Sequence, residues 1–484
     1  MNKIIKNYIY NSGYQILAII IPLITTPYLA RVIGADGYGQ YSFANSVSCY
    51  FIMFITLGLN NYGNRTIAAI RDDKKKLKTF FSEIYFVQLM CGFIVTFLYV
   101  CFYFLFFRDS LLQQLFIISI FSAILDINWL FFGLEKFRFI ATRNTIAKII
   151  LTIAIFLFVE TEDDILLFVI LSLGSTLISN IIMWPYAVRN VGFKRVSFDS
   201  IRKHMIPNVI LFIPVIAVNL YKYMDKIMLG YLCNMEQVGF YEYSDRVIMI
   251  PITLVNSLSI VMLPKMSNLV ATNRADSEKA YISYSMIFSM FFSSSISFGI
   301  MGVAKEFVPM FYGSGFTVCI FLYYILLPSC CFIAFSSVLR MQFLIPHKYD
   351  SIYIKSVVLG AVVNIVVNLL LISYFQAIGA AIGTLLAEVS VCIYQSLSIK
   401  KLVDIKGYLL DSIPFLISGI GMFTILYFIH IPIDSMLIQL VAKILFGAVI
   451  FLAFLCVSFA LRKEEYCRIY LIMIRVLGFE KGKD

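Results

Sequence analysis

The chain has 484 residues, of which 61% are hydrophobic and only 14% are charged, whereas soluble domains average about 45–50% and about 25%. A mean hydropathy of +0.88 over the whole length excludes an ordinary soluble fold and favours many membrane-spanning helices over a single anchor. The net charge of +11 does not indicate nucleic-acid binding, because Lys and Arg fall in short clusters between apolar runs, as they do in cytoplasmic loops of membrane proteins.

The apolar runs predict an all-α fold with about fourteen membrane-spanning helices, taking about 20 residues as one span. The first run continues through Pro22 and Pro27 with no small-x-small cleavage site, so we interpret it as an uncleaved helix and not as a signal peptide. The predicted helices lie near residues 11–33, 41–63, 80–106, 111–133, 141–159, 165–188, 206–230, 244–263, 281–303, 318–344, 352–374, 377–399, 409–430 and 435–461.

The distribution of positive charge supports this set of helices. With the N-terminus inside, 31 of the 39 Lys and Arg residues fall on the cytoplasmic side, in alternate loops and both termini. Four fall on the outer side, and four lie within helices. An error in the number of helices would scramble the sides, so both termini are predicted to be cytoplasmic. No loop is long enough for a folded soluble domain, and no GxxxxGK[ST] loop for nucleotide binding is present.

A weak internal repeat relates the two halves of the chain. YGQYSFANSV from Tyr38 matches VGFYEYSDRV from Val238 at a Gly, a Tyr and a Val, with an offset of 200 residues. LEKFRFI from Leu134 and PHKYDSI from Pro346 show a fainter similarity. An even number of helices per repeat gives both halves the same orientation. We therefore predict a six-helix lobe over residues 1–200, a second over 201–402, and two additional helices with a cytoplasmic tail over 403–484.

Eight stretches combine glycines and charges with apolar residues, and they occur in the order found in a known family. They are PYLARVIGADGYGQYSFA (27–44), LGLNNYGNRTIA (57–68), WLFFGLEKFR (129–138), DKIMLG (225–230), VGFYEYS (238–244), LPKMS (263–267), FYGSGF (311–316) and AIGAAIGTLLAE (377–388). The chain thus resembles the polysaccharide flippases of the multidrug/oligosaccharidyl-lipid/polysaccharide exporter superfamily, which include O-antigen and capsule repeat-unit flippases. The last two predicted helices resemble those of longer members and of lipid II flippases.

The resemblance implies a transporter of the bacterial cytoplasmic membrane, not an enzyme. It implies that an undecaprenyl-diphosphate-linked oligosaccharide moves from the cytoplasmic to the outer leaflet by alternating access, driven by an ion gradient. The expected partners are this lipid-linked sugar, the membrane lipids and the polysaccharide polymerase machinery. No cofactor or bound metal is expected. The 10 cysteines form no CxxC pair and are interpreted as packing residues. The coupling ion is left open between H⁺ and Na⁺.

A diphosphate crossing a hydrocarbon layer of about 30 Å needs cations in a wet cavity. Lys222 and Lys226 are one helical turn apart, and a buried membrane charge costs on the order of 2.5–3.5 kcal/mol on insertion scales. With Arg31 and Arg65 they form the predicted translocation site. Cations near helix ends have an alternative role as anchors at the lipid headgroups. All the substrate-binding candidates are Arg31, Arg65, Lys148, Lys222, Lys226, Arg246 and Arg340.

Three carboxylates within predicted helices are candidates for ion coupling or charge balance: Asp225, which lies between the two lysines, Glu388 and Asp126. The amides of Asn219, Asn364 and Asn368 suit either sugar binding or contacts between helices.

Two alternative functions remain open at this point. One is a cation-coupled exporter of small molecules on the same architecture. The other is a membrane polymerase or glycosyltransferase, which is disfavoured because the three histidines (His204, His347 and His430) each lie alone in the sequence.

Overall fold

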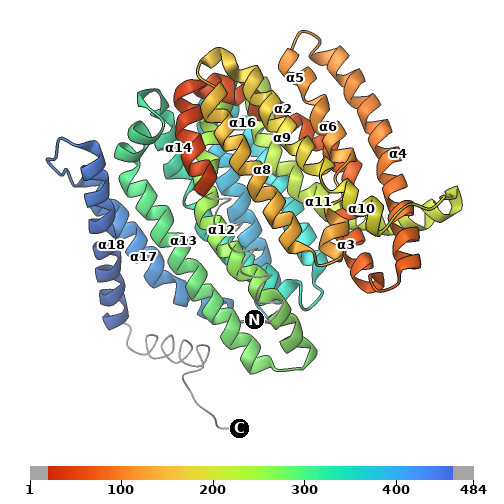
Figure 1. The fold of residues 1–484 in the computed structure, drawn as a ribbon. Coiled ribbons are helices and arrows are strands. Elements are labelled where there is room, and N and C mark those ends of the chain that lie inside the picture. The colour runs from red at the N-terminus through yellow and green to blue at the C-terminus, as the bar shows by residue number, and fades with distance from the viewer. Residues whose placement is uncertain (1–19, 462–484) are drawn as a thin grey trace. The chain divides into compact units, whose positions relative to one another are not determined.

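The computed structural model describes residues 20–461, and all of the regular secondary structure in this range is helical (Figure 1). The predicted all-α fold class is therefore confirmed. The chain divides by its internal contacts into two compact units, Met1–Gly239 and Phe240–Asp484. The predicted lobes at 1–200 and 201–402 rest on the sequence repeat and stay a prediction. Lys3, Lys6, the start of the first predicted helix and the basic C-terminal tail lie outside the described residues.

The first unit contains both long helices and helices of only a few turns. Among the described residues it begins with a short apolar helix, Ile20–Val32. The remaining elements are α2 (Gly34–Thr56), α3 (Leu59–Ile70), α4 (Lys74–Phe106), α5 (Leu111–Leu115), α6 (Ile117–Ile124), α7 (Asn128–Gly133), α8 (Phe137–Phe158), the 3₁₀ turn η1 (Glu162–Asp164), α9 (Ile165–Ile181), α10 (Trp184–Asn190) and α11 (Phe198–Leu232).

The second unit contains longer helices, and the first of them, α12, begins just before the boundary between the units. Its elements are α12 (Met235–Ala271), α13 (Ala275–Phe311), the 3₁₀ turn η2 (Ser314–Phe316), α14 (Val318–Leu326), α15 (Ser329–Leu339), the π-helical turn η3 (Arg340–Leu344), α16 (Asp350–Ile399), α17 (Ile405–Phe428) and α18 (Met436–Leu461).

Eleven helical stretches among the described residues are long and apolar enough to cross a membrane, and Ile20–Val32 is a shorter apolar helix. This number is consistent with fourteen spans. The long helix α16 contains two predicted spans, because Gln376 has φ 52° and ψ −130° and breaks the helix between predicted helices 352–374 and 377–399. In addition, α11 covers the predicted helix at 206–230.

Several predicted helix boundaries were wrong where the backbone breaks. The predicted helix 41–63 is in fact two helices, α2 and α3, separated at Leu57, whose φ of 45° lies in a region that a continuing helix does not use. The predicted helix 111–133 is divided into α5, α6 and α7. The helix predicted from residue 141 begins at Phe137. This last difference matters for the site described below.

Two of the family-like stretches pack against each other in the core of the first unit. The glycine of α3 lies so close to α7 that a Cβ at Gly63 would be 2.8 Å from Cε3 of Trp129. Reciprocally, a Cβ at Gly133 would be 2.6 Å from Cβ of Ile67. Both glycines therefore allow close approach of helices. Around them lies a cluster of buried apolar side chains that includes Phe81.

In the second unit, α17 and α18 pack beside α13, as Figure 1 shows. The Nζ of Lys443 in α18 lies 2.7 Å from Oε1 of Glu306 in α13 and 3.4 Å from the carbonyl of Leu426 in α17. The opposite face of α18 presents exposed apolar side chains such as Leu445 and Val449. A buried ion pair thus ties the last helix to its unit.

Candidate functional site

A polar cavity of about 340 Å³ lies in the first unit, between α8, α9 and the break that separates α6 from α7. Two of the predicted site residues, Asp126 and Lys148, line it together. The other lining residues are Asn128, Arg143, Asn144, Ala147, Leu151, Ser175, Thr176, Ser179 and Asn180. Such a concentration of amides, hydroxyls and charges within membrane-spanning helices is costly in hydrocarbon and is typical of a functional cavity.

The helix break that forms one wall has several of its carbonyl groups bonded by one side chain, Gln88. Because the chain leaves the helical path between α6 and α7, several carbonyl groups lose their intrahelical partners. The buried amide of Gln88 in α4 donates to the carbonyls of Ala123, Ile124 and Asp126 at 2.8–3.2 Å. Its own Oε1 accepts a hydrogen bond from Nε1 of Trp129 at 3.1 Å. Gln88 therefore stabilises the break and, with it, the position of Asp126.

The carboxylate of Asp126 is fixed at the start of α7. Its Oδ1 accepts the backbone N–H of Asn128, the first residue of α7, at 2.8 Å, which satisfies a donor that the helix itself leaves free. The third wall is attached to the same break, because Nδ2 of Asn180 in α9 donates to the carbonyl and the hydroxyl of Ser122, both at 3.0 Å. The cavity is thus defined by hydrogen bonds between helices as well as by packing.

Arg143 is the central cation of this cavity, and sequence reasoning missed it. Its guanidinium donates to Oδ1 of Asn144 at 2.6 and 3.1 Å, to Oδ1 of Asn128 at 3.1 Å and to the carbonyl of Ser179 at 3.3 Å. It interacts electrostatically with Asp126. The side chain is only 8% exposed. The helix predicted near 141–159 would place Arg143 at its cytoplasmic end, whereas α8 begins at Phe137 and carries Arg143 farther inside the helix.

The lining of the cavity contains two basic side chains, Arg143 and Lys148, and one acidic side chain, Asp126. Since guanidinium and ammonium groups bind phosphate, and amides and hydroxyls bind sugar hydroxyls, the lining suits an anionic or glycosidic group. The signal that could have identified Arg143 is its proximity in sequence to Asn144 and Lys148, all within about one and a half helical turns.

The predicted cations of α11 do not share one environment. Asp225 and Lys226 are buried, whereas Lys222 is exposed and has its Nζ 5.6 Å from the ring centre of Tyr223. Asp225 interacts electrostatically with the phenol of Tyr50 in α2. The prediction that the lysines are one turn apart on a helix agrees with α11, but the structure buries only one of them.

Two other predicted cations of the first unit are exposed. Arg31 lies near the end of the helix Ile20–Val32, and Arg65 lies in α3.

The predicted residues of the second unit have local partners. Arg246 pairs with Glu242 one turn earlier in α12, with 3.2 Å between Nε and Oε1. Arg340 begins the π-helical turn and lies 5.5 Å from the ring centre of Tyr353. Glu388 is buried in α16.

The embedded amides of α16 lie one turn apart in the half of the helix that precedes the break at Gln376. Nδ2 of Asn368 donates to Oδ1 of Asn364 at 3.3 Å, and a Cβ at Gly383 would be 2.1 Å from Oδ1 of Asn368. The lack of a side chain at Gly383 therefore lets the second half of α16 approach Asn368 closely. Asn219 donates to the carbonyl of Val215 in its own helix.

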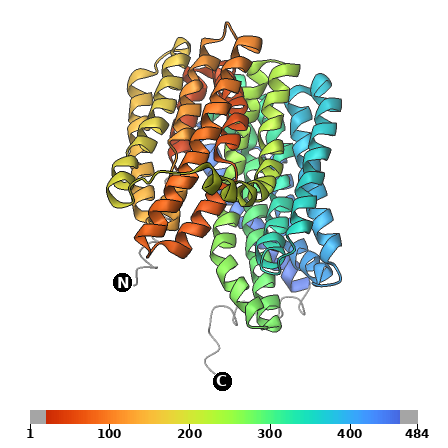
Figure 2. The same cartoon turned by 90° about the vertical axis from the view of Figure 1, so that its right-hand side faces the viewer.

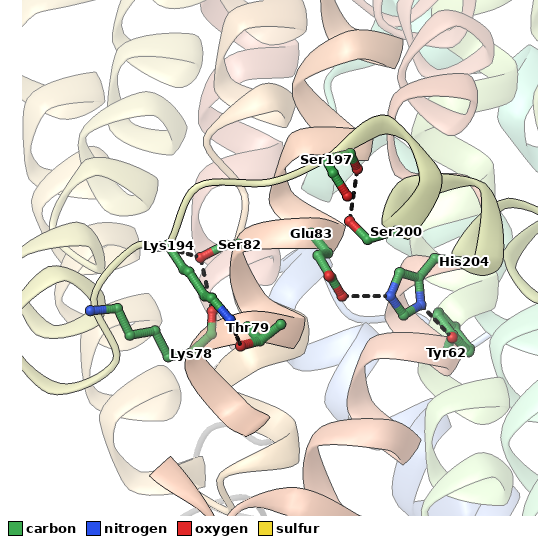
Figure 3. Close-up of polar contacts among 9 residues, drawn as sticks. All are labelled: Tyr62, Lys78, Thr79, Ser82, Glu83, Lys194, Ser197, Ser200 and His204. Atoms are coloured by element: carbon green, nitrogen blue, oxygen red, sulfur yellow. Dashed lines mark hydrogen bonds and ion pairs between the residues drawn. The ribbon is translucent and has the colours of Figure 1, made fainter. Parts of the chain in front are cut away.

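A second polar cluster connects three helices of the first unit (Figure 3). Nδ1 of His204 in α11 lies 2.8 Å from the hydroxyl of Tyr62 in α3, and its Nε2 lies 2.9 Å from Oε2 of Glu83 in α4. The connection between α10 and α11 is attached to α4 nearby, because the N–H of Lys194 donates to Oγ of Ser82 at 2.8 Å. Figure 2 shows this connection running across the helices of the first unit. His204 is isolated in the sequence but not in the structure.

Comparison with known proteins gives matches over most of the chain. A family model described as "Polysaccharide biosynthesis protein" matches residues 4–270. A putative O-antigen transporter of Escherichia coli (strain K12) is 23% identical over 398 residues, which are 81% of this chain and 95% of that protein. A protein of the same description from Shigella dysenteriae is 24% identical over 392 residues, covering 78% and 96%.

Among solved structures, the lipid II flippase MurJ in its inward closed conformation has the same fold. The TM-score is 0.75, with 16% sequence identity, and the match covers 94% of this chain and 99% of the other. At this identity the likeness concerns the fold alone.

Proposed function

The chain belongs to the polysaccharide biosynthesis protein family, and we propose that it flips a lipid-linked oligosaccharide across the bacterial cytoplasmic membrane. The observation that supports this most directly is the match to two putative O-antigen transporters over at least 95% of their length. The resemblance seen in the sequence is thereby confirmed at the level of the family. A multi-pass transporter, and not an enzyme, fits both the relatives and the membrane-spanning helices.

The proposed cargo is an undecaprenyl-diphosphate-linked repeat unit, taken from the cytoplasmic to the outer leaflet. Its diphosphate carries about two negative charges, and an unpaired charge in a low-dielectric cavity costs several kcal/mol. Arg31, Arg65, Lys222 and Lys226 are proposed to meet this charge, with Asp225 as the counter-ion. The polar cavity around Arg143 and Lys148 adds a second cationic surface within the same unit.

The proposed transport cycle is alternating access driven by a gradient of H⁺ or Na⁺. The carboxylates that would carry the ion are Asp225, Glu388 and Asp126, and the structure gives partial support because the first two are buried and the third lines the polar cavity. A functional link with the polysaccharide polymerase machinery is part of the same proposal, since the flipped repeat unit would be its substrate.

The experiment is translocation of a fluorescent lipid-linked oligosaccharide in proteoliposomes, with and without an ion gradient. Protein-dependent flipping that accelerates with a gradient is expected. The Arg31→Ala and Lys222→Ala variants should lose transport at matched membrane abundance, and Asp225→Asn should be milder if the carboxylate only balances charge. Normal flipping by both alanine variants would show that these cations anchor helices and that the cargo binds elsewhere.

A further inference from the structure

An apolar groove of about 560 Å³ runs between α8 and α9, which lie side by side in the first unit (Figure 1). It shares part of its wall with the polar cavity, because Arg143, Ala147 and Ser175 line both. Apart from Thr142 and Ser179, the rest of its lining carries no polar side chain, and its exposed side chains include Ile146, Ile150, Ile170 and Ile178. Along α8 the groove extends from Phe139 to Ala154, a rise of about 22 Å at 1.5 Å per residue.

A glycine keeps this groove open. Gly174 lies in the middle of α9 and lines the groove, yet a Cβ built on it would have no heavy atom within 4 Å. Gly in a helix interior costs roughly 0.5–1 kcal/mol relative to Ala. In Gly63 and Gly92 that cost is balanced by close contact with Trp129 and Ile124. No such contact explains Gly174. The lack of a side chain at this position leaves open space in the groove.

The end of the groove nearest the predicted cytoplasmic surface is basic. Phe139 is the last groove residue at that end of α8, and Arg138 and Lys136 directly precede it. Nζ of Lys136 lies 4.2 Å from the ring centre of Tyr186 in α10, which places this ammonium beside the end of the α9–α10 segment. Basic pockets between membrane helices on the cytoplasmic side are suited to anionic lipid headgroups.

We propose that the α8–α9 groove binds an anionic phospholipid of the inner leaflet, with one acyl chain along the groove and its phosphate at Lys136 and Arg138. The length of the groove exceeds the depth of one leaflet, about 15 Å, so a whole acyl chain fits along it. The charge at its end is complementary to a phosphate. The phosphate end, at Lys136 and Arg138, includes none of the cations proposed to meet the cargo, so the proposal stands whether or not the chain flips an oligosaccharide. The lipid would hold α8 and α9 together at the polar cavity.

The test is native mass spectrometry of the purified full-length protein with phosphatidylglycerol or phosphatidylcholine of identical chains. The wild type should retain phosphatidylglycerol about tenfold better than phosphatidylcholine. Gly174→Leu, which fills the groove where there is open space, should lower retention of phosphatidylglycerol at least fivefold. The double variant Lys136→Gln/Arg138→Gln should retain phosphatidylglycerol no more than about twofold better than phosphatidylcholine. Ile149→Phe is the matched control, because Ile149 is exposed on α8 but does not line the groove; it should behave like the wild type.

A second measurement guards against variants that fold poorly. Phosphatidylglycerol with a photoactivatable acyl chain should label peptides of α8 and α9 in the wild-type protein. Equal retention of the two lipids by the wild type, or labelling that avoids both helices, would overturn the proposal. Displacement of phosphatidylglycerol by an equal amount of undecaprenyl phosphate would overturn it as well, because it would assign the groove to the carrier lipid.

Discussion

The guanidinium of Arg143 is held by neutral oxygens of Asn128, Asn144 and Ser179 and has Asp126 as its electrostatic neighbour. Removing a guanidinium from water is costly, and the planar arrangement of its five N–H donors allows several of these acceptors to be satisfied at once. Lysine has a single ammonium and cannot reach the same set of oxygens.

We therefore expect Arg143→Lys to reduce translocation about tenfold, equivalent to about 1.4 kcal/mol, while membrane abundance is kept. The measurement is the proteoliposome assay at matched protein content. Arg189→Lys is the control, because Arg189 is exposed in α10. Unchanged transport by Arg143→Lys would mean that the polar cavity needs only a positive charge and not the guanidinium geometry.

At the scale of elements, glycines decide how closely α3 and α7 approach. A methyl group at Gly63 would meet the rigid ring of Trp129 at 2.8 Å, so the helices would have to separate. Gly63→Ala should destabilise the protein by about 1–3 kcal/mol, in the range of overpacking. Gly174→Ala is the control, since its methyl group meets nothing within 4 Å and should be neutral or stabilising. Thermal unfolding in detergent measures the stability of both variants. Equal melting temperatures for Gly63→Ala and Gly174→Ala would contradict the packing argument.

The ion pair between α13 and α18 provides a second test at this scale. Lys443 is 3% exposed, and Oε2 of Glu306 is buried with no hydrogen-bond partner among the described residues. Lys443→Met would leave the carboxylate of Glu306 without its cation, at a cost on the order of 3–5 kcal/mol. The double variant Lys443→Met/Glu306→Leu removes both charges and should recover most of that loss. A double variant as unstable as the single one, in the same unfolding assay, would show that α18 is held by packing alone.

For the whole molecule, the alternation of charge predicts on which side of the membrane each loop lies. Single-cysteine labelling should place the loop around Lys75 and the tail beyond Arg462 inside, and Asp163 outside. Labelling of positions 75 and 163 from the same side would be incompatible with fourteen helices. The experiment also tests the proposed orientation of the lipid site, because Lys136 must share the side of Lys75.

Much of the fold could be predicted because membrane spans are a local property. An apolar run of about 20 residues must be helical in lipid, since every backbone polar group needs a partner within the segment. The all-α class and the break in α16 between residues 374 and 377 follow from such runs and their interruptions. The family followed from stretches such as LNNYG and WLFFG, whose glycines the structure places in the α3–α7 contact.

The candidate site depended on contacts that are remote in sequence. Gln88 lies in α4, and nothing near it in the sequence indicates that its amide would satisfy the carbonyls of the α6–α7 break. Arg143 lines the cavity because α8 begins at Phe137, so that a charge expected at the end of a helix lies farther inside it and donates to Asn128. Gly174 is an ordinary helical glycine until the packing of α8 against α9 shows that nothing fills the space beside it. Hydrophobicity along the chain determined which segments are helices in the membrane, whereas only tertiary packing decided which polar groups meet and where space remains between them.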